Sequence, residues 1–377
     1  MPECDNPLWP CAMTGAAACL AGFDGMSVVI HGSSGCYYYP TTLLHAPLHG
    51  TFILENEVIF GSEDRLREVI SGLSGTGNRI AVITTCVPAI LGEDLQSLLA
   101  EHDVLLVDSP GFAGDAETGY TKALSLLAPQ TDAATEGVNI DGVCLLDPFC
   151  RGNLQELRRL LGLASVPVAT VFCRDSLHKT RTAATCTIGT NDDFRSGVGN
   201  YAGGTLGFGS LRSTFETLGT MFGESDVDPV LRELSLQEEE TVRICDKFLR
   251  RFDPPSVVIF AGVSYAEFAA ETLEHYLDAD ILFIGKRNPG TVSRFPAEPV
   301  TGLKEAQKII AQYDPDLVIG SSFERSVSGN RTFFGMTPPL RGVVRLAPVP
   351  LAGINGTLFF MEQVLNACMD HSRQGTG

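Results

Sequence analysis

Short apolar runs rich in β-branched residues alternate with amphipathic segments along most of the chain. Because the apolar runs are short and apolar on both faces, they are predicted to be buried parallel strands. They cover residues 26–30, 79–85, 103–108, 142–146, 166–172, 256–262, 279–285 and 315–320. Helical periodicity marks residues 62–73, 92–102, 153–163, 265–277 and 303–313. This alternation predicts an α/β fold with doubly wound, Rossmann-like parallel sheets.

The length of 377 residues exceeds what one such sheet usually needs, so we expect three α/β domains. An N-terminal domain is predicted over residues 1–130 and a middle domain over 131–195. The remainder, 196–377, is predicted to hold a Gly-rich connection, a long helical segment and a C-terminal α/β domain.

The charge balance limits the partners of the protein. The formal net charge of −18 argues against binding to nucleic acid or to an anionic membrane surface. No apolar run approaches the length of a membrane span, and the first residues lack the features of a signal peptide. We therefore expect a cytoplasmic protein that acts on small molecules or docks with another protein.

Eleven cysteines are present, and none of them forms a C-x-x-C pair. Zinc ribbons and ferredoxin-type runs are therefore excluded, and most of the thiols are expected to pack as small apolar side chains. Cys36 and Cys86 follow predicted strands, so both are expected at the carboxyl edge of one sheet, and Cys11 lies in a loop-like stretch. These three could converge on a metal cluster, or they could simply be packing residues.

Other chemistry has weaker signals. Residues 72–79, GLSGTGNR, lack the Lys-Ser/Thr pair of a P-loop, so the chain is not expected to hydrolyse ATP. His31 and Cys36 could form a nucleophile pair, but no residue is placed to orient the base. A basic group follows strands of the middle domain and could bind carboxylates or be ordinary surface charge; it comprises Arg151, Arg174, His178, Lys179 and Arg181.

Four segments in order resemble one protein family. PLWPCAMTGAAACLAGFDGMSVVIHGSSGC (7–36) is similar to the N-terminal cluster-binding region of nitrogenase component 1 subunits. ENEVIFGSEDRLREVI (55–70), TTCVPAILGEDL (84–95) and VDSPGFAGDAETGY (107–120) resemble the segments that follow in that family. Residues 147–168 and 314–324 fit later elements more loosely. The chain is thus identified as a member of the nitrogenase component 1-like oxidoreductases.

The resemblance implies a site. Cys11, Cys36 and Cys86 fall on the positions that ligate the iron–sulfur cluster at the subunit interface, either a 4Fe–4S or a larger P-cluster-like centre. Gly35 would let the backbone approach that cofactor closely. Cys186 stands roughly where the catalytic subunit places its cofactor cysteine, as a further candidate metal ligand, but no counterpart of the cofactor histidine is found.

The resemblance also implies a function, that of an oxidoreductase component that passes electrons from an ATP-hydrolysing iron protein to a bound small-molecule substrate. A homodimer, or a heterodimer with a related subunit, is expected. The length is close to that of the Ni-sirohydrochlorin a,c-diamide reductive cyclase component, which suggests a tetrapyrrole substrate; that family usually lacks a cysteine at the Cys11 position. The alternatives are an uncharacterised nitrogenase-like reductase of another small substrate, a scaffold for cofactor assembly, and a sugar- or nucleotide-binding protein without metal.

Overall fold

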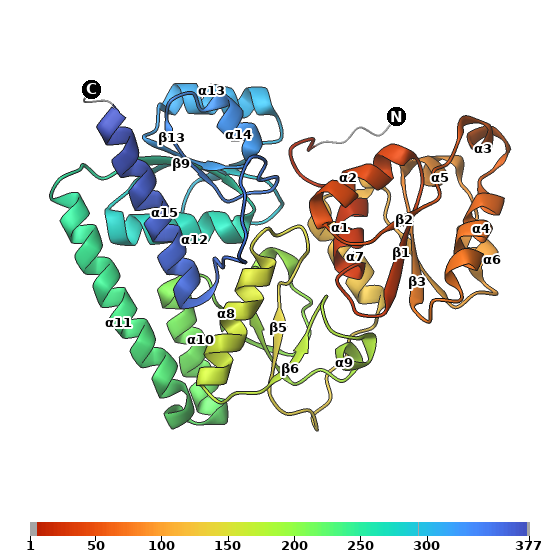
Figure 1. Cartoon of the computed structure of the whole chain (residues 1–377), viewed down its shortest axis with the longest axis horizontal. Coiled ribbons are helices and arrows are strands. Elements are labelled where there is room, and N and C mark those ends of the chain that lie inside the picture. The colour runs from red at the N-terminus through yellow and green to blue at the C-terminus, as the bar shows by residue number, and fades with distance from the viewer. Residues whose placement is uncertain (1–5, 293, 375–377) are drawn as a thin grey trace.

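The computed structural model describes residues 6–292 and 294–374. It contains three parallel sheets of four, four and five strands, each flanked by helices (Figure 1). The predicted α/β fold with several parallel sheets is therefore confirmed. Along the chain, the sheets follow one another without interleaving, so each is built from one continuous stretch of sequence.

The first sheet has the order β2-β1-β3-β4, with β1 and β3 paired along their full length. Its strands are β1 (Met26–His31), β2 (His49–Gly50), β3 (Arg79–Thr84) and β4 (Val104–Asp108). The helices of this unit are α1 (Ala12–Leu20), α2 (Ser34–Leu44), α3 (Glu55–Phe60), α4 (Glu63–Leu73), α5 (Cys86–Leu91), α6 (Leu95–Leu99) and α7 (Ala116–Leu126), with a 3₁₀ turn η1 (Gly111–Ala113). Helices α1 and α7 pack tightly because Gly15 and Gly119 let their backbones approach closely: a Cβ at either glycine would lie under 2 Å from a carbonyl oxygen of the other helix.

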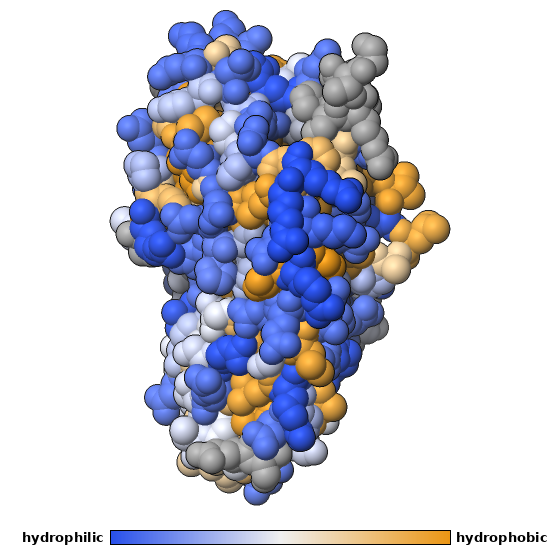
Figure 2. All heavy atoms as spheres, turned by 90° about the vertical axis from the view of Figure 1, so that its left-hand side faces the viewer, coloured by the Kyte–Doolittle hydropathy of each residue, from blue (hydrophilic) through white to orange (hydrophobic). Residues whose placement is uncertain are grey.

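The second sheet has the order β6-β5-β7-β8. Its strands are β5 (Val138–Asp141), β6 (Val168–Val171), β7 (Cys186–Gly189) and β8 (Asn200–Gly204), accompanied by α8 (Cys150–Leu163), α9 (Leu177–Arg181), η2 (Asp192–Phe194), α10 (Gly207–Phe222) and the long α11 (Glu224–Leu249). From the side of α11, the surface mixes hydrophilic and hydrophobic residues (Figure 2).

The third sheet has the order β11-β10-β9-β12-β13. Its strands are β9 (Ser256–Ala261), β10 (Asp280–Lys286), β11 (Ala297–Pro299), β12 (Leu317–Gly320) and β13 (Thr332–Gly335), accompanied by α12 (Val263–Leu277), α13 (Leu303–Tyr313), α14 (Ser322–Val327) and α15 (Gly353–Gln374). Helix α15 packs against β13 and also against α8 and α10, so one hydrophobic core joins the second and third sheets. One face of the first sheet has a separate core with residues such as Val29 and Val82, and the core on its other face also includes Cys144 and Phe194 of the stretch around the second sheet.

One predicted strand is wrong. Residues 142–146 do not form a strand; the strand is β5, which ends at Asp141. The sequence pattern missed it because Asn139 and Asp141 are polar, yet both are buried and satisfied: the Asn139 side chain pairs with the backbone of Ala184, and Asp141 accepts from Ser196. Gly142, at φ +75°, ends the strand. The apolar run 142–146 had suggested that Cys144 lies in a strand. In the structure, Cys144 is buried in a loop.

Two further expectations are changed in detail. The helix predicted at 92–102 is shorter, since α6 covers only 95–99 and α5 precedes it. Strand β8, at residues 200–204, pairs with β7 although it lies beyond the predicted end of the middle domain at 195. The domain limits themselves stay predictions. Within the described residues, no helix has the length and apolar character needed to cross a membrane.

Candidate functional site

Three cysteines of the first unit stand at the beginnings of helices. Cys11 is the residue that precedes α1, Cys36 lies in the first turn of α2, and Cys86 is the first residue of α5. Helices α2 and α5 start directly after β1 and β3, two strands that are paired in register, so their first turns lie at the same edge of the sheet. Backbone N–H groups at a helix start favour negative charge, which suits a thiolate.

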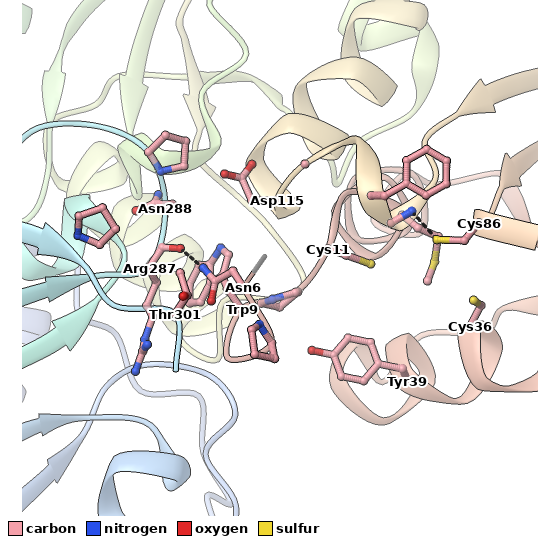
Figure 3. Close-up of a pocket in the computed structure, with 18 of the residues that line it drawn as sticks. Asn6, Trp9, Cys11, Cys36, Tyr39, Cys86, Asp115, Arg287, Asn288 and Thr301 are labelled. Carbon is pink, nitrogen blue, oxygen red and sulfur yellow. Dashed lines mark hydrogen bonds between the residues drawn. The ribbon is translucent and has the colours of Figure 1, made fainter. Parts of the chain in front are cut away.

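These thiols face one cavity with a volume of about 730 Å³ (Figure 3). All three cysteines line it and are partly exposed, unlike most of the other described cysteines. The opposite wall comes from the segment after β10, where Arg287 and Asn288 lie. The cavity therefore lies between the first and third units of the fold.

Gly111 brings two of the sulfur atoms close together. Its backbone N–H donates to Cys86 Sγ at 3.1 Å. A Cβ placed on Gly111 would lie 3.1 Å from Cys86 Sγ and 3.3 Å from Cys11 Sγ, so both sulfur atoms lie within 3.3 Å of one point. A hydrogen bond from an N–H group to sulfur stabilises the thiolate form and a metal bound by that thiolate. Sequence reasoning missed Gly111 as a site residue, although it lies in the SPGF run that follows β4.

Cys36 has a perturbed pKa. Burial raises the pKa of Cys36, while a contact with the Ser33 hydroxyl, 3.8 Å from Sγ, lowers it, and the neighbouring thiols of Cys86 and Cys11 raise it again. The influence of Cys86 and Cys11 on Cys36 is consistent with thiols that face one cavity. Gly35 lines the same cavity, and a Cβ there would meet only Ser33 Oγ, at 4.0 Å. Its predicted role in close approach stays a prediction.

His31 is a buried connector and not a partner of Cys36. Its Nδ1 lies 3.2 Å from Thr51 Oγ1, and its Nε2 lies 3.2 Å from both Glu93 and Ser62. Burial lowers the pKa of His31, and Glu93 opposes that shift. The contact between Glu93 and His31 ties the loop after α5 to the end of β1, so the histidine helps to fix the helix that begins at Cys86. The nucleophile-pair hypothesis has no support in this geometry.

Beside the cysteines, a hydrogen bond between polar side chains connects the first and third units. Glu117 accepts hydrogen bonds from Trp9 Nε1, at 2.9 and 3.1 Å, and from Asn288 Nδ2, at 3.0 Å. Burial and the nearby Asp193 raise the pKa of Glu117 to about 8. The first and third units thus meet at one buried carboxyl group, which lies near Asp193 of the second. Glu117 lies in the family-like segment 107–120 but was not singled out there, and Asn288 lies in none of the segments that carry the resemblance.

The other described cysteines pack away from this cavity. Cys19 and Cys173 are buried, with their sulfur atoms 3.4 Å apart, as expected for cysteines that pack as small apolar side chains. Cys186 is buried at the start of β7, within the core that joins the second and third sheets, and does not line the cysteine cavity. Its predicted metal role stays untested. Cys4 lies outside the described residues. The basic side chains of the middle unit, such as Arg174 and His178, are exposed.

The donor atoms of the cysteine cavity are compatible with an iron–sulfur cluster. Among the described residues, no three His, Cys, Asp or Glu side chains are arranged around one metal ion. Three soft sulfur donors around a cavity of this size instead match a multinuclear iron–sulfur centre. The N–H of Gly111 donates to Cys86 Sγ, and the lack of a Cβ on Gly111 lets Cys86 Sγ and Cys11 Sγ lie close to its backbone. Both features would help to hold such a centre.

Comparison with known proteins agrees with the sequence motifs. The chain is 30% identical over 186 residues to a nitrogenase molybdenum-iron protein beta chain of Sinorhizobium fredii, a match covering 43% of this chain and 36% of that protein. It is 23% identical over 277 residues to a nitrogenase iron-iron protein beta chain of Rhodobacter capsulatus, covering 67% of this chain and 54% of that one. The chain thus spans only about a third to a half of the length of these relatives.

A solved structure described as nitrogenase Cp1 at pH 6.5 has the same fold, with a TM-score of 0.79 at 15% identity, over 97% of this chain and 93% of that one. Among protein families, residues 11–369 match the nitrogenase component 1 type oxidoreductases. That range includes all three cavity cysteines and all three sheets, and it confirms the resemblance carried by the four sequence motifs. The chain therefore belongs to the nitrogenase component 1 type oxidoreductase family.

Proposed function

We propose that this protein is the cluster-bearing component of a two-component, nitrogenase-like reductase. Cys11, Cys36 and Cys86 would hold an iron–sulfur cluster, and an ATP-hydrolysing iron protein would supply the electrons. The observation that carries the proposal is the convergence of these three cysteines on one cavity, with the Gly111 N–H directed at one of the sulfur atoms.

The residues around the cavity have separable tasks. The thiolates would bind iron, and the Gly111 N–H would stabilise negative charge on Cys86. Phe112 and Met13 line the cavity with apolar surface, which limits access of water to the sulfur atoms. An iron–sulfur cluster bound here would take up and release single electrons. We propose a cytoplasmic setting, where cysteine ligands stay reduced.

We also propose that the cluster lies at an interface between two subunits. One chain offers three thiolates, whereas a 4Fe–4S cubane takes four, so a second copy or a related subunit would complete the site. The neighbouring surface supports this, because the adjacent helices α3 and α5 expose large apolar side chains. They include Ile59, Phe60, Ile90 and Leu91, of which Phe60 is 86% exposed.

For the substrate, a small molecule such as a tetrapyrrole is our first candidate, on the grounds of chain length and family resemblance. An uncharacterised nitrogenase-like reductase of another small substrate is the alternative. A cofactor-assembly scaffold would bind the same cluster but would not turn over substrate, so it is distinguished by activity and not by iron content.

The test is iron and acid-labile sulfide analysis after anaerobic purification. We expect the wild-type protein to hold iron, Cys36→Ala to lose most of it, and Cys368→Ser, at a cysteine outside the cavity, to keep it. The cluster proposal fails if the wild-type protein holds no iron or if the two variants hold equal amounts. Reconstitution with an iron protein and ATP then separates a reductase, whose cluster is reduced in an ATP-dependent way, from a scaffold.

A further inference from the structure

A second large cavity, beside the edge strand β13 of the third sheet, is lined by arginines. Its volume is about 780 Å³, and Arg325, Arg331, Arg341 and Arg345 all contribute to its wall. Asp370 is the one acidic side chain among the described residues that line it. This cavity shares no lining residue with the cysteine cavity.

Its charge is opposite to that of the rest of the protein. The chain has 45 acidic residues against 27 lysines and arginines, yet here four arginines face one acid. A third cavity, of about 520 Å³ at the junction of the units, shows the reverse: its described lining contains no basic side chain, and its acidic ones are Glu117, Asp192, Asp193, Glu267 and Glu271. The arginine cavity is therefore a place where an anion would be favoured.

Arg345 is held in an unusual environment. Its guanidinium carbon lies 4.3 Å from the ring centre of Phe149 and 5.9 Å from that of Phe359. Its Nη1 atom is buried without a hydrogen-bond partner among the described residues. Burial lowers the pKa of Arg345, and Asp147 opposes that shift. A buried N–H group without an acceptor is costly, and an oxyanion bound in the cavity would supply one.

The neighbouring arginines are also available for a ligand. Arg331 pairs with Asp314 at 2.5 Å, but Arg325, Arg341 and Arg345 form no ion pair within the described part of the chain. Ser322, whose hydroxyl lies against the backbone of Arg341, adds a hydroxyl to the wall. Guanidinium groups bind carboxylates and phosphates through two parallel hydrogen bonds.

The remaining wall is apolar. Phe333, Phe334, Phe359 and Leu340 line the cavity beside the arginines. At its mouth, the loop before α15 carries Val344, which is 87% exposed. A wall with both guanidinium groups and aromatic rings suits a ligand that has an apolar body and charged edges.

We propose that this cavity binds an organic anion that combines an apolar or aromatic body with carboxylate or phosphate groups. The guanidinium groups of Arg341 and Arg345 hold the oxyanions, and the phenylalanine rings contact the body. This binding site shares no lining residue with the cysteine cavity and needs no iron. The anion proposal can therefore be correct if the protein binds no cluster, and the cluster proposal can be correct if no anion binds here.

The test is calorimetric titration of the full-length protein, purified anaerobically, with benzene hexacarboxylate and, separately, with inorganic pyrophosphate. We expect binding of at least one of them, weakened about tenfold by Arg341→Gln and by Arg345→Gln, because each removes one charge-assisted contact. Arg158→Gln is the matched control: Arg158 is exposed on α8 and outside the cavity, and its loss should leave the affinity unchanged.

The two probes separate the sources of the anion. Tighter binding of the aromatic carboxylate identifies a carboxylate ligand with an apolar body, whereas tighter binding of pyrophosphate identifies a phosphate ligand. Arg341 is exposed, so the Arg341→Gln substitution leaves the core intact. The affinity of this variant still tests the proposal if Arg345→Gln folds poorly. The proposal is overturned if neither probe binds at about 1 mM. It is also overturned if Arg158→Gln weakens binding as much as the cavity variants do.

Discussion

Glu117 and Trp9 together give this protein an internal reporter of protonation. Trp9 is the single tryptophan of the chain, and its indole N–H donates to Glu117. Burial, helped by the nearby Asp193, raises the pKa of Glu117 from 4.5 to about 8, although the indole N–H of Trp9 favours its charged form. The carboxyl group should therefore be protonated at neutral pH, and its titration should change the indole environment.

The magnitude follows from proton linkage. Between pH 4.5 and about 8 the unfolded chain has lost the Glu117 proton while the folded protein retains it. Since the folded state binds the extra proton, its stability falls as the pH rises, by about 1.4 kcal/mol per pH unit. Over that window the loss is on the order of 5 kcal/mol, and above pH 8 this contribution becomes constant.

Two measurements test this. Trp9 fluorescence of the folded protein should change with a midpoint near pH 8, and Glu117→Gln, which cannot ionise, should abolish the change. In urea, the unfolding free energy of the wild-type protein should fall more steeply between pH 5 and 8 than that of Glu117→Gln. Glu101→Gln, at an exposed carboxylate, is the matched control and should behave like the wild-type protein. If the wild-type and Glu117→Gln proteins show the same pH dependence in both assays, the reasoning is refuted.

Glycine substitutions test the packing of the site and of its supporting helices. Gly111→Ala places a methyl group 3.1 Å from Cys86 Sγ and should weaken iron retention against a chelator about tenfold. Gly72→Ala, in open space and outside the cysteine cavity, is the control and should retain iron like the wild-type protein; equal retention by the two variants would contradict the assignment of Gly111. Gly15→Ala forces a Cβ to within 1.8 Å of a carbonyl of α7 and should lower the free energy of unfolding in urea by at least about 2 kcal/mol. Gly72→Ala, in open space on α4, should instead leave the free energy of unfolding unchanged or raise it by up to about 1 kcal/mol. If Gly72→Ala lowered the free energy of unfolding as much as Gly15→Ala, the contact between α1 and α7 would not be the cause.

The apolar runs predicted most of the sheet correctly because their burial is local information. β1, β3, β9 and β10 all lie within a residue or two of their predicted limits. β5 was missed for a physical reason: its polar Asn139 is satisfied by the backbone of Ala184, 45 residues away, and a pattern of apolar residues cannot encode such a partner.

The candidate site was predictable to a similar extent. The positions of Cys36 and Cys86 after paired strands predicted that they would share an edge, and the motifs added Cys11. What the sequence could not predict is the opposite wall. The contact between Glu117 and Asn288 joins residues 171 positions apart, and it depends on how the first and third units pack together.

That packing has a consequence for the cysteines. The wall facing them is anchored at Arg287, whose side chain forms a buried ion pair with Glu324 and whose carbonyl accepts from Asn6 at 2.7 Å. Breaking such a buried pair from one side usually costs several kcal/mol, so this wall is rigid within its own unit. One tie between the units runs through Glu117, which accepts from Asn288 and whose pKa burial raises to about 8. The shape of the cysteine cavity is therefore set by fixed walls joined through a titrating contact, and the environment of a bound cluster should respond to pH through that contact even though none of its ligands is altered.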